Sequence, residues 1–139
     1  MPIVSLVNVQ PQSIGSLPAV GPLAFGLWRY TDPDVAAAQC LLETALDAGM
    51  NLVDTADVYG LDWGGSGFGS VEEILGSVLA VAPSLRHRMV LATKGGILPP
   101  VPYDSSPEHL RRACEDSLRR MKTDVIDLYY LHRWDMSVP

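Results

Sequence analysis

Four side chains that could carry acid, base or hydrogen-bonding chemistry fall where apolar, strand-like segments end. Asp54 lies near the end of NLVDTAD, Lys94 is the last residue of MVLATK, and His132 is the last residue of VIDLYYLH. Tyr59 follows the first of these segments, in its loop. In a parallel α/β sheet the carboxyl ends of the strands point to one face, where active sites form. The four side chains are therefore predicted to converge.

Charge supports the same grouping. A charge at the end of an apolar strand is costly to bury without a partner, and the Asp54 carboxylate and Lys94 ammonium can neutralise each other. Taken singly, each residue has a plainer explanation. Asp54 could form a turn, Lys94 could mark a strand end at the surface, His132 could be a core histidine, and Tyr59 could pack on a rim. These separate explanations leave the shared position of all four unexplained.

Hydrophobic periodicity predicts the elements that position these residues. Strands are expected at roughly 22–28, 51–55, 89–94 and 125–131, alternating with helices whose apolar residues recur at helical spacing. The strands are apolar on both faces, as in a parallel sheet covered by helices. Two architectures fit this alternation: an open doubly wound sheet, and a parallel (β/α)8 TIM barrel. A full barrel needs about 250 residues, so this chain would supply about the first four βα units.

The predicted helix starts carry recognisable capping residues. Asp32 precedes a proline and is expected to cap the first helix. Ser70 and Glu73 have the spacing of a capping box for the second helix. Ser106, also followed by a proline, is the expected cap of the third. Residues 1–20 precede this pattern and are predicted to form an irregular arm with a small hairpin, so that 21–139 makes up the half-barrel.

Composition excludes several classes of function. The chain has 139 residues and a formal net charge of -6, which argues against binding nucleic acid or an anionic membrane. No metal-ligand spacing stands out, so no metal is expected. Cys40 and Cys114 are interpreted as reduced, buried thiols, with a disulfide between them as the alternative. With no leader-like segment and no apolar run near the ~20 residues that span a bilayer, the predicted location is cytoplasmic.

A glycine-rich loop, GGSGFGS, follows the second strand and raises a different hypothesis, a dinucleotide-binding fingerprint. Its glycines at 65, 67 and 69 lack the G-x-G-x-x-G spacing, and the loop begins some residues after the strand. No acidic residue ends a strand about twenty residues further on. A flexible active-site loop accounts better for these glycines.

The same segments resemble the aldo-keto reductase family, and the resemblance runs from about residue 21 to the end. NLVDTADVYG resembles the family signature in which an aspartate is followed five residues later by the catalytic tyrosine, which gives Asp54 and Tyr59. VLATKGG resembles the segment of the catalytic lysine, Lys94. SLRRMKTDVIDLYYLHRWD resembles the segment that ends in the catalytic histidine, His132, and is close to bacterial versions.

The resemblance implies an NADPH-dependent oxidoreductase that reduces an aldehyde or ketone to an alcohol. Tyr59 would donate the proton, and because a free tyrosine is a weak acid at neutral pH, the Lys94 ammonium would favour its deprotonation. Asp54 would hold Lys94, and His132 would orient the carbonyl oxygen. Four residues are implied at the nicotinamide end of the cofactor NADPH/NADP: Gly26, Leu27, Trp28 and Asp54. Which carbonyl compound is the substrate stays open.

The family resemblance also gives a second hypothesis, because the main pyrophosphate and adenosine contacts come from the second half of such barrels. The chain could be a truncated, inactive relative that acts as a partner-binding or structural subunit. Open barrel edges at the first and fourth strands predict self-association. Seven apolar strand residues are expected on a partly exposed inner face: Leu23, Phe25, Leu52, Val90, Ala92, Ile126 and Leu128.

Overall fold

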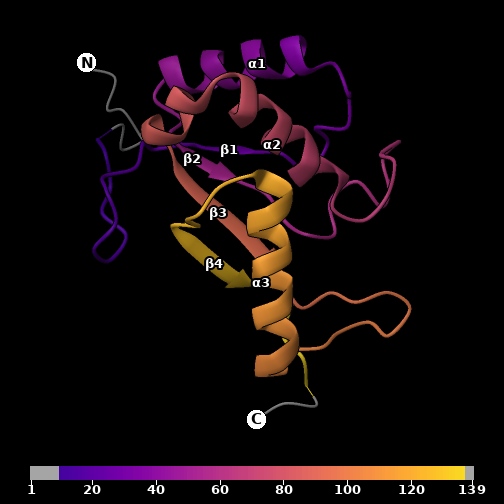
Figure 1. Ribbon diagram of the computed structural model, residues 1–139. Helices are drawn as coiled ribbons and strands as arrows, with labels where there is room; N and C mark the ends of the chain where they lie inside the picture. The colour runs from indigo at the N-terminus through magenta and orange to yellow at the C-terminus, as the bar shows by residue number, and fades with distance from the viewer. Residues whose placement is uncertain (1–9, 137–139) are drawn as a thin grey trace, which may run out of the picture.

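The computed structural model describes residues 10–136. Within this range the chain alternates strands and helices: β1 (Ala24–Gly26), α1 (Val35–Asp47), β2 (Leu52–Asp54), α2 (Ser70–Val81), the 3-10 helix η1 (Pro83–Arg88), β3 (Val90–Gly95), α3 (Pro107–Met121) and β4 (Leu128–Leu131). The strands run parallel in the order β1-β2-β3-β4. Helices α1, α2 and α3 lie along one side of the sheet (Figure 1). This is part of a barrel; a doubly wound sheet would have helices on both faces and strands out of sequence order.

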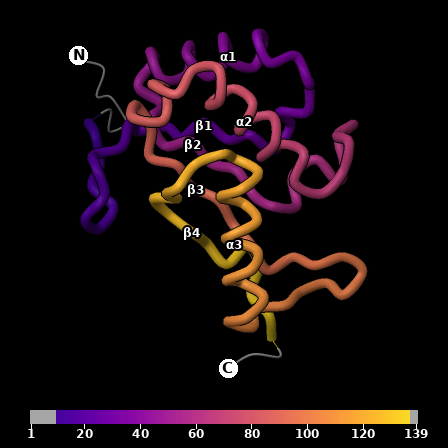
Figure 2. Tube along the Cα trace, in the orientation of Figure 1, coloured from indigo at the N-terminus to yellow at the C-terminus, as the bar shows by residue number. Residues whose placement is uncertain are grey.

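The core lies between the sheet and the helices. Side chains alternate across a strand, so Val53 and Leu91 face the helices and are fully buried, whereas Asp54 and Lys94 point to the opposite, inner face. The loops that follow β2 and β3 project from the same end of the sheet (Figure 2). This end carries the candidate site.

Two of the three predicted helix caps are wrong. α1 begins at Val35, and the cap is Asp34, whose side chain accepts hydrogen bonds from the next turn, at 2.9 Å from Ala36 N and 3.1 Å from Ala37 N. Asp32 instead accepts from Asp34 N, at 3.0 Å, in a turn around Pro33 that precedes the helix. The cap predicted for α3 is confirmed, because Ser106 Oγ accepts from a backbone N–H of the first turn.

The capping box predicted for α2 does not form either. The cap is Gly69, in the left-handed conformation with φ of 84°, and Ser70 is already the first helical residue. A Cβ at Gly69 would lie 2.6 Å from the Arg120 side chain, so only glycine fits there. The observed cap lies one residue before the predicted one, because Gly69 both turns the chain and makes room for Arg120.

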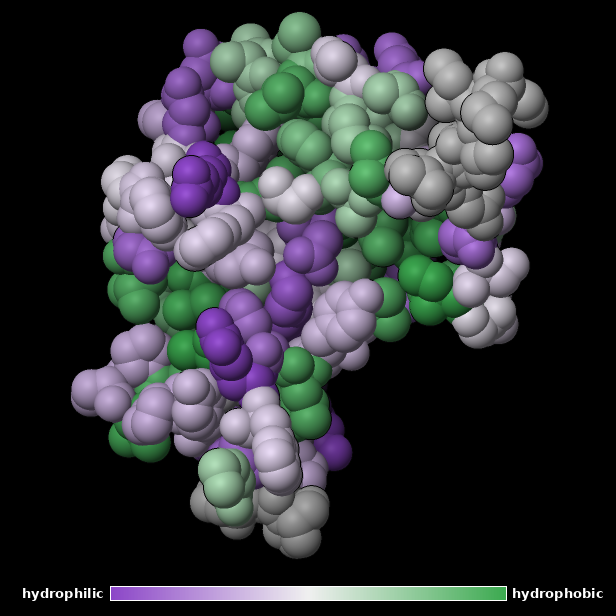
Figure 3. All heavy atoms as spheres, turned by 180° about the vertical axis from the view of Figure 1, so that it is seen from behind, coloured by the Kyte–Doolittle hydropathy of each residue, from purple (hydrophilic) through white to green (hydrophobic). Residues whose placement is uncertain are grey.

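The inner face is less apolar than expected. Phe25 pairs in register with Val53 and packs against the helix-side core, as does Ile126. Val90 and Ala92 are buried rather than partly exposed. Figure 3, which shows the back of the molecule, has a band of hydrophilic residues running between hydrophobic areas. Of the seven predicted residues, Leu23 is the one with a large exposed side chain, at 63 %.

The N-terminal arm and the cysteines complete the comparison between the predicted and the observed fold. Residues 10–20 contain an isolated antiparallel bridge between Gln12 and Val20, in line with a small hairpin; positions 1–9 of the predicted arm lie outside the described range, as do 137–139. Cys40 is exposed, so the prediction that it is buried is wrong. The buried side of α1 carries Ala38 and Leu42, and Cys40 lies between them on the other side.

Candidate active site

Lys94 is the centre of the candidate site. Its ammonium donates hydrogen bonds to the Asp54 carboxylate and to the backbone carbonyl of Thr55, each at 2.7 Å. A third contact, 3.3 Å long, joins it to the Tyr59 hydroxyl. The ammonium also lies 4.9 Å from the centre of the Tyr59 ring. A lysine has three N–H donors, so these partners use its full capacity and fix its position.

Strand register explains why these groups meet. Asp54, the last residue of β2, is opposite Ala92 in the neighbouring strand, two residues before Lys94 on the same face. The backbone N–H of Asp57 then donates to the Lys94 carbonyl at 3.1 Å, which keeps the start of the loop against β3. Tyr59 lies one turn further, with its N–H bonded to Ala56 O at 3.1 Å.

His132 reaches the site from β4. It directly follows the strand, and its backbone N–H donates to the Gly95 carbonyl at 2.9 Å. Its ring stands edge-on to that of Tyr59, with centroids 5.7 Å apart. The pKa of His132 is lowered from 6.5 to about 4, mainly by burial and to a smaller extent by the nearby positive charges of Lys94 and Arg133. The imidazole is therefore neutral at pH 7 and keeps one N–H to donate.

An open pocket of about 320 Å³ lies beside these groups. Tyr59 and His132 form part of its wall, together with Trp28. Sequence reasoning missed its other lining residues, because they come from loops whose conformation no periodicity predicts: Val58, Leu61, Asp62, Ile97 and Arg133.

The predicted nicotinamide-end residues are only partly brought together. Gly26 ends β1 opposite Asp54, and a Cβ added there would meet nothing within 4 Å, so the space above it is open. Trp28 lines the pocket. The Leu27 side chain is buried in the helix-side core, and only its backbone joins the site, through an N–H bonded to Asp54 O at 2.9 Å.

A second charged cluster lies on the helix side of β3, and sequence reasoning missed it. Glu72, fully buried on α2, accepts hydrogen bonds from Thr93 Oγ1 at 2.6 Å and from Arg120 Nε at 2.8 Å. Asp57 is buried beside them, and burial followed by the charge of Glu72 raises its pKa to about 7. A charged residue on the apolar side of α2 was the available signal for Glu72, and nothing in the local sequence indicated that Arg120 is its partner.

Across residues 10–136 no cluster of three or more His, Cys, Asp or Glu side chains could hold a metal ion. In the same range, every helix is too short or too polar to cross a membrane.

Comparison with known proteins shows which family the chain resembles. A model of the Aldo/keto reductase family matches residues 22–139. A 6-dehydroglucose reductase from Novosphingobium aromaticivorans is 56% identical over 120 residues, which cover 85% of this chain and 39% of that protein. A 6-dehydroglucose reductase from Agrobacterium fabrum is 35% identical over 125 residues, or 81% of this chain and 40% of that protein.

Among solved structures, the holo form of an aldo-keto reductase from Bacillus halodurans superposes with a TM-score of 0.74 at 30% identity. The match covers 95% of this chain and 43% of that one. The chain thus spans about two fifths of the length of these relatives, and the fold is the corresponding part of their barrel. By the extent of the family match, supported by these relatives, the chain belongs to the aldo/keto reductase family.

Proposed function

We propose that the chain is the part of an NADPH-dependent carbonyl reductase that bears its catalytic residues, and that Asp54, Tyr59, Lys94 and His132 carry the chemistry. The observation that supports this most directly is the Lys94 ammonium, held between the Asp54 carboxylate and the Tyr59 hydroxyl. The predicted cytoplasmic location goes with this proposal.

Tyr59 is the proposed proton donor. As the hydroxyl gives its proton to the carbonyl oxygen of the substrate, negative charge develops on the phenol oxygen. The Lys94 ammonium, 3.3 Å away, stabilises that charge, and Asp54 keeps the ammonium in place. His132, neutral because of its lowered pKa, donates its N–H to the same carbonyl oxygen and orients it.

Four residues would hold the nicotinamide end of NADPH. The open space above Gly26, the half-exposed ring of Trp28 and the backbone of Leu27 fit a flat group lying against the end of β1. The carboxylate of Asp54 lies beside them, opposite Gly26. NADPH, when bound, supplies the hydride of the reaction.

The proposed substrate is a hexose that carries an aldehyde at C6. Two relatives, including one 56% identical to this chain, are named 6-dehydroglucose reductases. The pocket beside Tyr59 has room for a substrate of this size and combines aromatic, aspartate and arginine side chains.

The test uses a complete barrel, made by replacing the matching segment of the Novosphingobium relative with this chain; we refer to it as the chimera. Tyr59→Phe in the chimera is expected to lower the rate of NADPH-dependent aldehyde reduction by a factor of about 100 or more, because the proton donor is lost. NADPH affinity should stay nearly unchanged. Tyr129→Phe is the matched control, since that hydroxyl lies toward α3, 3.5 Å from Leu110 O. Substantial turnover in Tyr59→Phe would refute the assigned acid.

The exposed edges of the sheet favour a second candidate function, in which the chain is a partner-binding or structural subunit. The outer strands β1 and β4 each have one neighbour within the described residues, and Leu131 on β4 is 59% exposed. Such edges pair with other chains, so the isolated 139-residue chain is expected to self-associate. Light scattering of the isolated chain tests this self-association. Aldehyde reduction by the chimera separates the two functions, because a degenerate partner-binding piece gives no turnover and a catalytic piece does.

A further inference from the structure

Trp63, in the loop between β2 and α2, has an exposed indole ring in a defined setting. Trp63 is 52% exposed, and Trp28 is 46% exposed. The two ring centres lie 5.5 Å apart in an edge-to-face arrangement. The Arg29 guanidinium lies over both, 4.1 Å from the Trp63 centre and 5.4 Å from the Trp28 centre. The three side chains form one unit, which we call the tryptophan platform.

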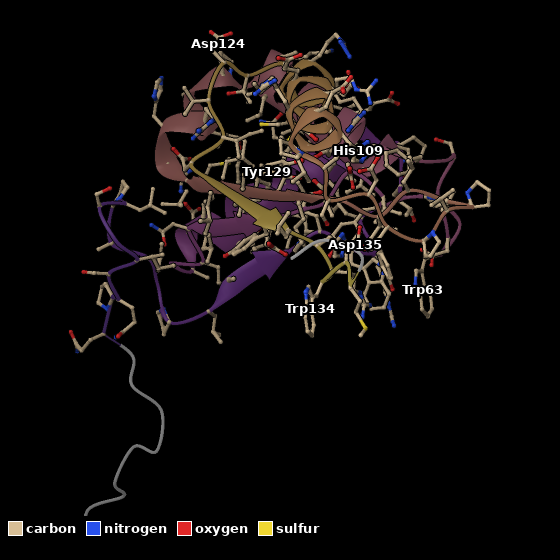
Figure 4. All side chains as sticks on the ribbon, turned by 90° about the horizontal axis from the view of Figure 1, so that it is seen from below. Trp63, His109, Asp124, Tyr129, Trp134 and Asp135 are labelled. Carbon is tan, nitrogen blue, oxygen red and sulfur yellow. The ribbon has the colours of Figure 1, made fainter. Side chains whose placement is uncertain are left out.

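The backbone holds this ring outward. Trp63 has φ of 57°, a left-handed conformation that is unfavourable for a bulky side chain. Its carbonyl accepts a hydrogen bond from Thr31 Oγ1 at 3.3 Å, which ties the loop to the segment after β1. In Figure 4, Trp63 projects outward at the edge of the molecule, and Trp134 projects on the same side. Large apolar rings are normally buried, so an exposed ring held at a strained position points to a ligand.

The tryptophan platform adjoins the candidate active site. Trp28 belongs both to the platform and to the wall of the pocket that contains Tyr59 and His132. Asp62, next to Trp63 in the chain, lines the same pocket, as does Arg133. A flat apolar surface is therefore combined with a carboxylate, which accepts hydrogen bonds, and a guanidinium, which donates them.

We propose that Trp63 is a specificity-determining residue that stacks on the apolar face of the substrate's pyranose ring, while Asp62 and Arg133 bind its hydroxyl groups. This inference rests on the proposed reductase function. The ring carbons of a pyranose present C–H bonds on its faces and hydroxyls at its edge, and this matches an indole with polar groups around it. Arg29 acts as a positioning residue, because its cation–π contacts fix the orientation of both indoles.

The experiment compares two substrates in the chimera: glucose oxidised to the aldehyde at C6, and propanal, which has no ring. Trp63→Ala is expected to lower kcat/KM for the hexose by roughly tenfold, mainly through KM, and to lower kcat/KM for propanal much less. Trp63→Phe should retain most of the hexose activity, since it keeps an aromatic face. Trp134→Ala, which removes a tryptophan 79% exposed outside the platform, is the matched control and should behave as the unsubstituted chimera.

Binding gives an independent readout. Glucose, which has no carbonyl at C6, should give saturation-transfer NMR signals from its ring protons with the chimera, and these should weaken in Trp63→Ala. Failure of the chimera to reduce either aldehyde would refute the proposed function. If the hexose is reduced and Trp63→Ala leaves its KM unchanged, or impairs propanal equally, the stacking role is overturned.

Discussion

Thr93 and Lys94 are neighbours on β3, and their side chains leave the strand on opposite faces, each toward a carboxylate. On the inner face Lys94 meets Asp54, and the two side chains are 16% and 27% exposed. On the helix face Thr93 meets Glu72, which is fully buried and paired with Arg120. The inner pair contacts Tyr59, which lines an open pocket. The outer pair lies between α2 and α3, with Glu72 fully buried and Arg120 19% exposed.

The two pairs show that the groups around an ion pair decide whether it can take part in proton transfer. Glu72 accepts hydrogen bonds from Thr93 and Arg120, and Arg120 also donates to Ser117, so both charges are paired with groups that do not titrate near neutral pH or with each other. Lys94 gives its third hydrogen bond to the Tyr59 hydroxyl, a group that can lose a proton. Lys94 and Asp54 therefore form a reactive pair, and Glu72 and Arg120 form a structural pair.

The largest expected effect is on the reactive pair. Lys94→Met keeps the length of the side chain and removes its charge, so charge that develops on the Tyr59 oxygen is no longer stabilised. We expect the rate of aldehyde reduction by the chimera to fall by a factor of about 100 or more. Unfolding in urea should change much less than activity, because the Asp54 carboxylate is 27% exposed and can be solvated. Retention of activity with a large loss of stability would reverse the assignment of the two pairs.

The structural pair is expected to respond in stability. Glu72→Gln replaces an accepting oxygen with an N–H₂ group and leaves the Arg120 guanidinium unpaired in the protein. Removing one partner of a buried ion pair costs about 3–5 kcal/mol, and the 19% exposure of Arg120 favours the lower end. Activity per folded molecule should be unchanged.

The control for this variant is an exposed pair of the same type. Asp47 and Arg88 form an ion pair whose side chains are 72% and 42% exposed. Asp47→Asn should change the free energy of unfolding by less than about 1 kcal/mol. Equal losses in Glu72→Gln and Asp47→Asn, measured by urea denaturation of the chimera, would show that enclosure by α2 and α3 adds nothing.

The same comparison explains what the sequence could predict. The order of strands and helices follows from apolar periodicity, and the reactive pair follows from polar residues at strand ends. The contacts of Lys94 with Asp54 and Tyr59 agree with that prediction, whereas their catalytic roles stay proposals. The pair of Glu72 and Arg120 joins residues 48 positions apart on two helices, and local pattern carries no information about such a contact.

Loop conformation is the second feature that could not be predicted from the sequence. The cap of α2 was predicted at Ser70 because its spacing to Glu73 is favourable, yet the position of Arg120 requires the glycine before it. Trp63 was also missed, because its exposed position depends on a left-handed backbone and on Arg29 packing over the ring. In both cases a side chain distant in the sequence, or an irregular backbone, decided the local structure.

The smallest expected effect concerns Asp57, whose backbone N–H donates a hydrogen bond to the Lys94 carbonyl while its carboxyl group lies near Glu72. Burial, then the charge of Glu72, raises the pKa of Asp57 from 3.8 to about 7 in the folded protein. Between these values the native state binds a proton that the unfolded chain has released, so stability falls as pH rises through this window.

Asp57→Asn removes this titration, and its effect should therefore depend on pH. Relative to the unsubstituted chimera, the variant should gain about 2–4 °C in Tm at pH 8, where buried Asp57 is ionised, and little at pH 4, where it is protonated. Asp124→Asn, at an exposed position, is the control and should show no such trend. Because Arg120 and Lys94 lower the same pKa, a lower Tm of Asp57→Asn at pH 8 would mean that their attraction for the carboxylate outweighs the cost of burying it. In that case Asp57 would belong with the structural pair, as a third charge that helps to hold Arg120 against Glu72.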